Sequence, residues 1–214
     1  MIAMTIFPRR PRALAVLLLA GVLLATGCAG LRPAVDADPA ARAAFDQRAD
    51  RVAAIDTWRL VARLGLATGE EYWSAQLNWR ASNGGHVLDL AGPMGRGGGR
   101  LTLAEAQPAE LVTRAGEQFR AQDPDALVAH ITGEAIPVSG MIYWVRGLVD
   151  PARAHQLDVA ADGRPLRIEQ SGWTVEYREF EDVNGIAMPV RMDMEHDGME
   201  LRARIGSWLM ESPQ

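Results

Sequence analysis

The sequence predicts a mainly β protein, built as one antiparallel sheet of about eleven strands that curls around a few short helices. Three observations lead to this fold class. Apolar and polar residues alternate with a period of two over most of the chain, which is typical of strands with one buried and one wet face. Tight-turn sequences separate the alternating segments. Only one internal stretch has helical spacing instead.

The alternation is clear in both halves of the chain. In the first half, the apolar positions from Trp58 to Leu66 share one strand face, and residues 73–79 alternate in the same way. The turn at residues 82–85 predicts a hairpin. In the second half, residues 166–169, 173–178, 188–194 and 199–205 alternate, with tight turns at 161–163 and 196–198. We therefore expect six strands before the helical stretch and five after it.

Three helices are predicted. Residues 39–55 are rich in Ala and Arg and carry apolar residues at helical spacing. Asp123 and Pro124 are a typical cap and first-turn pair, followed by an apolar helix side at Leu127, Val128 and Ile131. Pro137 interrupts the chain, and a further helix is expected over residues 139–148.

A single sheet with one apolar face has to cover that face, and the chain offers only these helices to do so. We therefore expect the sheet to curl into an open or partly closed barrel with an apolar concave side. Such a cavity, lined by Trp and flexible Met side chains, suits a lipid. The alternative is that the same residues form a filled core. The residues expected to line the cavity are Trp58, Leu60, Trp79, Leu88, Leu90, Trp144, Trp173, Tyr177 and Met192.

The N-terminus has the composition of a secretory signal. Arg9, Arg10 and Arg12 precede an apolar run over residues 13–25, which is too short for a comfortable membrane span. The run ends at Cys28, the only cysteine, in a sequence similar to a bacterial lipobox with Ala25 three residues before the cysteine. We predict a signal peptide over residues 1–27, an acylated cysteine and tether over 28–38, and one domain over 39–214. The alternative is an ordinary signal peptide in which Cys28 is incidental.

The charge balance limits the partners. Without the three signal arginines, 19 basic residues face 27 acidic ones, a formal net charge of −8, and the chain has no lysine. An acidic domain argues against nucleic acid and against electrostatic binding to anionic lipid. We expect membrane contact to come from acyl chains and apolar contacts.

No catalytic or metal-binding motif stands out. The four histidines have no metal-ligand spacing, and the acidic residues around His196 fit a hairpin turn better than a metal site. There is no Gly-x-Ser-x-Gly elbow, and the Gly-rich stretch 95–100 lacks the lysine of a phosphate loop. The expected protein is not an enzyme, holds no cofactor or metal, and is a monomer.

Residues 88–101, LDLAGPMGRGGGRL, place one large apolar side chain, Met94, between Pro93 and Gly95 on a turn that should face water. From the residues alone, Met94 would more simply fold back onto the barrel rim.

The ordered set of segments resembles the LolB family of outer-membrane lipoproteins over nearly the whole predicted mature chain. The matching segments are the lipobox around Cys28, the strand that contains Trp79, LDLAGPMG at 88–95, FRAQDPDALV at 119–128, GEAIPVSGMIYWVRGL at 133–148, GWTVEYREF at 172–180, MPVRMDM at 188–194 and LRARIGSW at 201–208.

The resemblance implies an eleven-stranded antiparallel half-barrel with a helical lid. Because Trp144 lies on the helix expected over residues 139–148, we expect it to close the mouth of the cavity. It implies that the protein receives lipoproteins from a soluble periplasmic carrier, similar to LolA, and inserts them into the inner leaflet of the outer membrane. The residue after Cys28 is Ala29, not the aspartate that would favour the inner membrane. The family's protruding apolar turn matches Pro93, Met94 and Gly95, where methionine replaces the usual leucine. The alternative function is a structural or lipid-sensing outer-membrane lipoprotein that binds proteins without transferring lipoproteins.

Overall fold

The computed structural model describes residues 38–93 and 97–211, which belong to one compact unit, residues 37–214. Met94, Gly95 and Cys28, and with them the predicted signal peptide and most of the tether, lie outside the described residues. No helix in the described part of the chain is long and apolar enough to cross a bilayer.

Eleven antiparallel strands form one sheet in the order β6-β5-β4-β3-β2-β1-β11-β10-β9-β8-β7. In chain order, these strands are β1 (Trp58–Thr68), β2 (Glu71–Ser82), β3 (Gly85–Ala91), β4 (Gly98–Leu103), β5 (Ala109–Thr113), β6 (Gln118–Ala121), β7 (His155–Val159), β8 (Pro165–Gln170), β9 (Trp173–Val183), β10 (Ile186–His196) and β11 (Met199–Met210). The chain starts in the middle of the sheet, runs out to the edge at β6 and returns from the opposite edge at β7. The predicted strand count and its division into six and five are confirmed.

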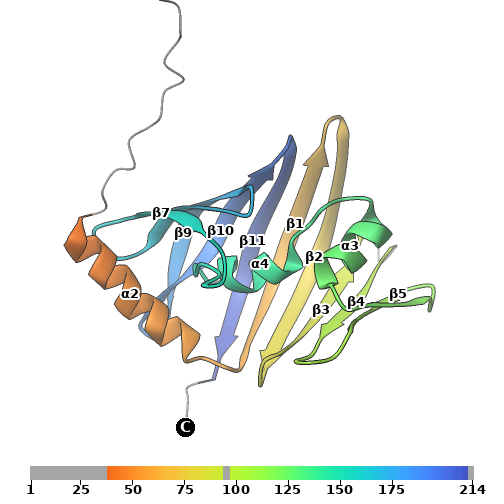
Figure 1. Ribbon diagram of the computed structural model, residues 1–214, viewed down its shortest axis with the longest axis horizontal. Coiled ribbons are helices and arrows are strands. Elements are labelled where there is room, and N and C mark those ends of the chain that lie inside the picture. The colour runs from red at the N-terminus through yellow and green to blue at the C-terminus, as the bar shows by residue number, and fades with distance from the viewer. Residues whose placement is uncertain (1–37, 94–96, 212–214) are drawn as a thin grey trace, which may run out of the picture. The chain divides into compact units, whose positions relative to one another are not determined.

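The passage between the two edges contains the internal helices. α3 (Pro124–Thr132) and α4 (Val138–Trp144) follow β6 and lie across the inner face of the curled sheet (Figure 1). Because the chain has to cross from one edge strand to the other, these helices cover the apolar face that the sheet leaves open. The predicted curled, unclosed sheet with a helical cover is therefore confirmed.

Local sequence explains where the helices begin and end. The Asp123 carboxylate accepts hydrogen bonds from the backbone N–H groups of Asp125 and Ala126, at 2.9 and 3.3 Å, and Pro124 occupies the first turn. α2 (Pro39–Ala53) starts in the same way after Asp38, and ends two residues before the predicted limit. α4 is shorter than the predicted 139–148, because the chain leaves the helix after Trp144 in a turn through Gly147, whose φ is +69°.

The inward residues of most strands join one hydrophobic core. The burial of β1 alternates strictly over Trp58 to Leu64, as the sequence pattern predicts. α2 packs at the other end of the sheet, near β7 and β10. There Arg48, only 3% exposed, donates hydrogen bonds of 2.8 to 3.0 Å to the carbonyl oxygens of Arg146, Gly147 and Ala187. One buried guanidinium thus ties α2 to the turn after α4 and to β10.

Candidate acyl-binding cavity

The inner side of the sheet encloses an apolar cavity of about 570 Å³. Its walls come from β1 to β5 and β11, and its cover comes from α3, α4 and the segment between them. The apolar side chains that line it are Leu64, Leu66, Trp73, Leu77, Leu88, Leu90, Leu101, Leu111, Val128, Ile131, Ile136, Val138, Met141 and Leu201. A volume of this size lies within the range of small-molecule and lipid sites.

Leucine, and not tryptophan or methionine, dominates this lining. Eight leucines contribute to it, against one Trp and one Met. Of the nine residues predicted to line a cavity, only Leu88 and Leu90 do so. The prediction of a Trp- and Met-rich lining does not describe this cavity.

The other seven predicted lining residues are buried in the filled part of the core. They are at most 6% exposed and none of them contributes to the cavity wall: Trp58, Leu60, Trp79, Trp144, Trp173, Tyr177 and Met192. Aromatic rings pack against each other there, with centroids 5.5 Å apart for Trp58 and Trp79 and 6.3 Å apart for Trp144 and Trp173. For these positions, the packed-core alternative fits the structure better.

Trp144 does not close the mouth of the cavity in this structure. Its side chain is fully buried, and its indole Nε1 donates a 2.9 Å hydrogen bond to Oε1 of Gln170 on β8. The Tyr177 hydroxyl donates a 2.7 Å hydrogen bond to the Trp144 carbonyl oxygen. α4 is therefore fixed to the sheet by Trp144, while Val138 and Met141 face the cavity.

The two helices that cover the cavity, α3 and α4, are also linked to each other. The backbone N–H of Ser139, at the start of α4, donates a 2.9 Å hydrogen bond to the Asp125 carboxylate on α3. One carboxylate thus links the two helices that roof the cavity. The sequence gives Asp125 no distinguishing signal, because its partner lies fourteen residues further along the chain.

The cavity reaches the protein surface near the hairpin between β1 and β2. Trp73 is 40% exposed and Glu71 is exposed, and both line the cavity. Glu134 and Ile136, from the segment between α3 and α4, line it as well. The strand alternation places Trp73 on the same face as Leu77 and Trp79, so the sequence already indicates that Trp73 faces the concave side of the sheet.

The Gly-rich end of the 88–101 stretch has a structural cause. A Cβ atom on Gly98, where φ is +89°, would lie 2.3 Å from the carbonyl oxygen of Leu90. A Cβ on Gly99 would lie 2.6 Å from the carbonyl oxygen of Val112. Two glycines are therefore needed at the start of β4, where this strand lies close between β3 and β5.

The acidic residues around His196 belong to a hairpin turn and not to a metal site. Asp197 and Gly198 have φ values of +46° and +80° and connect β10 to β11. His196 stacks on Trp173 with ring centroids 5.2 Å apart. Within residues 38–93 and 97–211, no three His, Cys, Asp or Glu side chains are grouped so as to hold a metal ion.

A family model described as outer membrane lipoprotein LolB matches residues 56–208. The chain belongs to the LolB family. A LolB described as an outer-membrane lipoprotein from Alkalilimnicola ehrlichii is 37% identical over 195 residues, which cover 90% of this chain and 96% of that protein. Those from Stutzerimonas stutzeri and Halorhodospira halophila are each 33% identical, and cover 87% and 92% of this chain and 90% and 95% of their own lengths.

Solved structures agree on the fold. A LolA superfamily protein from Nitrosomonas europaea aligns with a TM-score of 0.54 at 9% identity, covering 81% of this chain and 94% of that one. A putative outer membrane lipoprotein-sorting protein domain from Vibrio parahaemolyticus gives 0.55 at 11% identity, covering 80% and 92%. The LolB family membership makes this chain an outer-membrane lipoprotein of the lipoprotein-localisation system.

Proposed function

We propose that this LolB family member accepts lipoproteins from a periplasmic LolA-like carrier, holds their acyl chains in the leucine-lined cavity and releases them into the inner leaflet of the outer membrane. The observation that carries this proposal is the apolar cavity of about 570 Å³ under α3 and α4. A purely structural lipoprotein needs no such space, and burial would favour a filled core at these positions.

The transfer needs no covalent step. Moving an acyl chain from one apolar site to another is driven by differences in burial, at about 0.8 kcal/mol for each methylene. The cargo leaves the carrier because this cavity buries more of the chain, and leaves the cavity because the bilayer buries more still. The opening beside Trp73 and Ile136 offers a route that keeps apolar surface away from water.

The ends of the process are assigned to residues that lie mostly outside the described part of the chain. The signal peptide over residues 1–27 is removed, Cys28 carries the acyl anchor at the periplasmic face, and residues 28–38 act as a tether. Pro93, Met94 and Gly95 form a turn whose apolar tip enters the membrane and assists delivery. The sequence around Cys28 and the place of Met94 in the family's turn support these assignments.

A transfer assay tests acceptance and delivery separately. The mature chain with Cys28→Ala is mixed with a carrier loaded with lipoprotein, with and without liposomes. Wild type accepts cargo and passes it to liposomes. Leu90→Glu places a charge in the cavity and should reduce acceptance at least tenfold, since a buried carboxylate is costly. Met94→Glu should accept cargo normally and deliver it poorly.

Val61→Glu is the matched control. Val61 lies on the outer face of β1 and is 39% exposed, so the same substitution there should change neither step. Circular dichroism confirms that each variant is folded. If wild type accepts no cargo, the transfer function is wrong and a structural or lipid-sensing lipoprotein becomes the better account. If Leu90→Glu accepts cargo as well as wild type, the cavity is not the binding site.

A further inference from the structure

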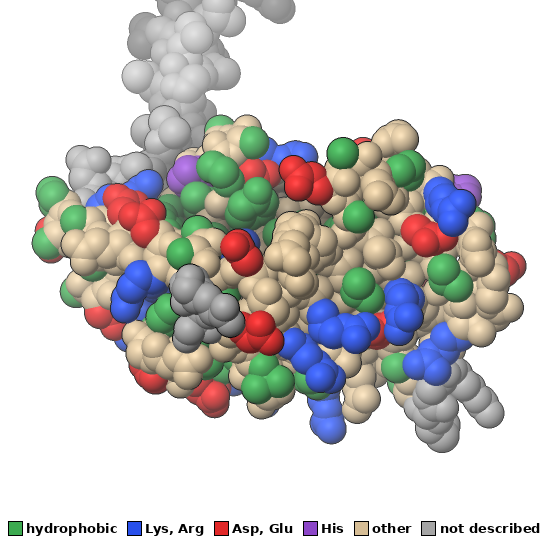
Figure 2. All heavy atoms as spheres, turned by 90° about the horizontal axis from the view of Figure 1, so that it is seen from below, with side chains coloured by type: hydrophobic (Ala, Val, Ile, Leu, Met, Phe, Trp, Pro, Cys, Tyr) green, Lys and Arg blue, Asp and Glu red, His purple; other side chains and the backbone are tan. Residues whose placement is uncertain are grey.

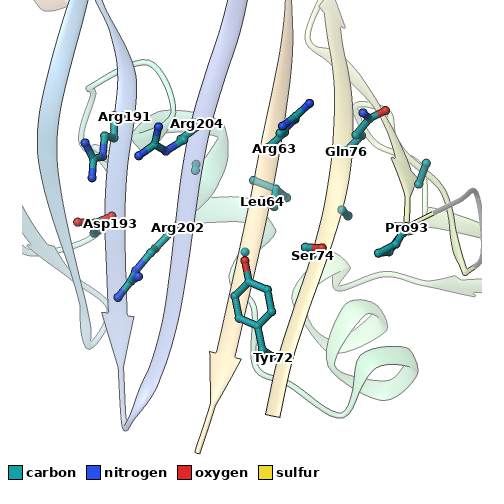
Figure 3. Close-up of a pocket in the computed structure, with 15 residues that line it drawn as sticks. Arg63, Leu64, Tyr72, Ser74, Gln76, Pro93, Arg191, Asp193, Arg202 and Arg204 are labelled. Carbon is teal, nitrogen blue, oxygen red and sulfur yellow. The ribbon is translucent and has the colours of Figure 1, made fainter. Parts of the chain in front are cut away.

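A second hollow of about 790 Å³ lies on the outer face of the same sheet (Figure 3). It crosses β2, β1, β11 and β10, and residues 91–93 border it where β3 ends. Polar side chains point into it, in contrast to the leucine-lined cavity behind the strands. We call this hollow the arginine groove, after Arg63, Arg191, Arg202 and Arg204, which line it.

Strand register brings three of these arginines into one row. Arg63 on β1 is directly opposite Arg204 on β11, and Arg204 is directly opposite Arg191 on β10. Like charges in directly opposed cross-strand positions destabilise a sheet. The row of three arginines therefore costs stability, and binding of an anion would offset that cost.

The carboxylates nearby neutralise only part of the groove. Arg191 pairs with Glu179 at 3.0 Å, and Arg202 pairs with Glu200 at 2.6 Å. Asp193, the one acidic residue of the lining, accepts a 2.9 Å hydrogen bond from Arg178 outside the lining. In the residues that the structure describes, Arg63 and Arg204 have neither a salt bridge within 4 Å nor a side-chain hydrogen bond, and both are exposed.

Three further lining residues on β2 supply neutral hydrogen-bond donors. Tyr72 lies over the outer face of β1, and a Cβ atom on Gly65 would come within 2.8 Å of its hydroxyl oxygen. The absence of a side chain at Gly65 therefore leaves the space that Tyr72 occupies. Ser74 and Gln76 continue the lining along β2. Guanidinium groups beside hydroxyl and amide donors are a typical environment for phosphate oxygens.

The position of the groove indicates which phosphate-containing ligand it would bind. Pro93, the first residue of the proposed insertion turn, lines the groove (Figure 3). A turn that reaches into a bilayer brings the groove beside it close to the headgroups. A lipoprotein cargo carries a diacylglyceryl thioether, which has no phosphate, so the cargo lipid is a poor occupant. At physiological salt the Debye length is about 8 Å, so these arginines outweigh the acidic remainder of the domain at close range.

We propose that the arginine groove binds the phosphate headgroup of anionic phospholipid in the outer-membrane leaflet and so orients the Met94 turn toward the bilayer. This inference rests on the proposed function, because it takes that turn to face the membrane. It also revises the expectation that an acidic domain makes no electrostatic contact with lipid. Figure 2 shows arginine side chains gathered on one part of the surface, among few acidic ones.

Vesicle binding tests the groove. The mature chain with Cys28→Ala, which retains the whole compact unit of residues 37–214, is floated with vesicles of phosphatidylcholine alone or with one quarter phosphatidylglycerol. Wild type should prefer the anionic vesicles, and the preference should fall between 50 and 300 mM salt. A basic residue near such a surface contributes about a fivefold effect, so Arg63→Gln with Arg204→Gln should weaken binding roughly 25-fold.

Arg42→Gln with Arg51→Gln is the matched control, because it removes the same charge from exposed positions on α2. This control should bind like wild type. Equal binding by both double variants, or no preference of wild type for anionic vesicles, would overturn the proposal. If the groove variant loses affinity for the carrier instead, the groove contacts the carrier and the lipid assignment is wrong.

Cargo acceptance from the carrier, measured without vesicles, separates this proposal from the transfer function. The groove variant should accept cargo as wild type does. A wild-type protein that accepts no cargo but still binds anionic vesicles through Arg63 and Arg204 would contradict the transfer function and leave the groove in place.

Discussion

His86 should make the stability of the domain depend on pH in a range where few other groups titrate. Its ring is half-buried at the start of β3, and its centroid lies 5.9 Å from those of Trp58 and Trp79. The Trp79 indole donates a 3.3 Å hydrogen bond to Nδ1 of His86, so the neutral ring carries its proton on Nε2. Burial, followed by the nearby Arg146 charge, lowers the pKa of His86 from 6.5 to about 4.

The sign of the effect follows from linkage. Because the pKa is lower in the folded state, the unfolded chain takes up the proton first as the pH falls. The contribution of His86 is therefore complete above about pH 6.5 and is lost as the pH falls toward 4. At about 1.36 kcal/mol for each pH unit, this interval corresponds to about 3 kcal/mol, and solvent screening of the half-exposed ring reduces the expected loss to about 2 kcal/mol.

Urea unfolding followed by tryptophan fluorescence measures this loss at pH 7.5, 6.0 and 4.5. Carboxylates begin to titrate at the lowest pH, so the comparison is with His86→Asn, whose amide oxygen can still accept from Trp79 and which has no charge to gain. Wild type should lose about 2 kcal/mol more than His86→Asn between pH 7.5 and 4.5. Equal losses in the two proteins would refute the reasoning.

Three further substitutions test the contacts that hold α2, β4 and α4 in place. Arg48→Ala removes the guanidinium that donates to one buried and two part-buried carbonyl groups, and should lower the free energy of unfolding by about 3 kcal/mol. Arg51→Ala, at an exposed position of α2, should change the free energy of unfolding by less than about 0.5 kcal/mol in the same urea titration. Gly98→Ala places a Cβ at a backbone position with positive φ and brings it too close to the carbonyl oxygen of Leu90. The thermal unfolding midpoint of this variant should therefore fall by at least about 5 °C. An unchanged midpoint would contradict the close approach of β4 to β3 at Gly98. Tyr177→Phe removes the hydroxyl that holds α4 and should cost about 1–2 kcal/mol, with faster amide exchange in α4 than in β10; uniform exchange would argue against a local role.

The fold was largely predictable because period-two alternation reports which side of a strand is buried. Apolar residues occupy every second position from Trp58 to Leu66 and from Met199 to Ile205, and the Asp123-Pro124 pair marks the start of α3. The short α4 was harder, because an apolar run does not show where the chain leaves a helix. There the turn through Gly147 decided the end.

The cavity was less predictable than the sheet, because alternation gives the direction of a side chain but not the space in front of it. Trp58 and Trp79 point inward as expected, yet their volume fills the core together with Trp208. The space remains where leucines from β1 to β5 face α3 and α4. The path of the helices across the sheet decides which inward residues line the cavity. A local sequence pattern does not predict that path.

The arginine groove shows the same limit on the outer face. The sequence places Arg63 and Arg204 on the wet sides of their strands, but 141 positions separate them in the chain. Only the register between β1 and β11 shows that they are directly opposed. The net charge sums over the whole domain, so it does not show this local cluster of arginines.

Site-specific crosslinking during transfer tests the central claim most directly. With Cys28→Ala the chain has no other cysteine, so Leu90→Cys and Val61→Cys can each carry one thiol-linked photoreactive group. Loaded carrier is added, and the mixture is irradiated before liposomes are present. Our account predicts that the cargo lipoprotein crosslinks to position 90, inside the cavity, and not to position 61 on the outer face. Crosslinking at position 61 alone, or at neither position while cargo is transferred, would contradict it.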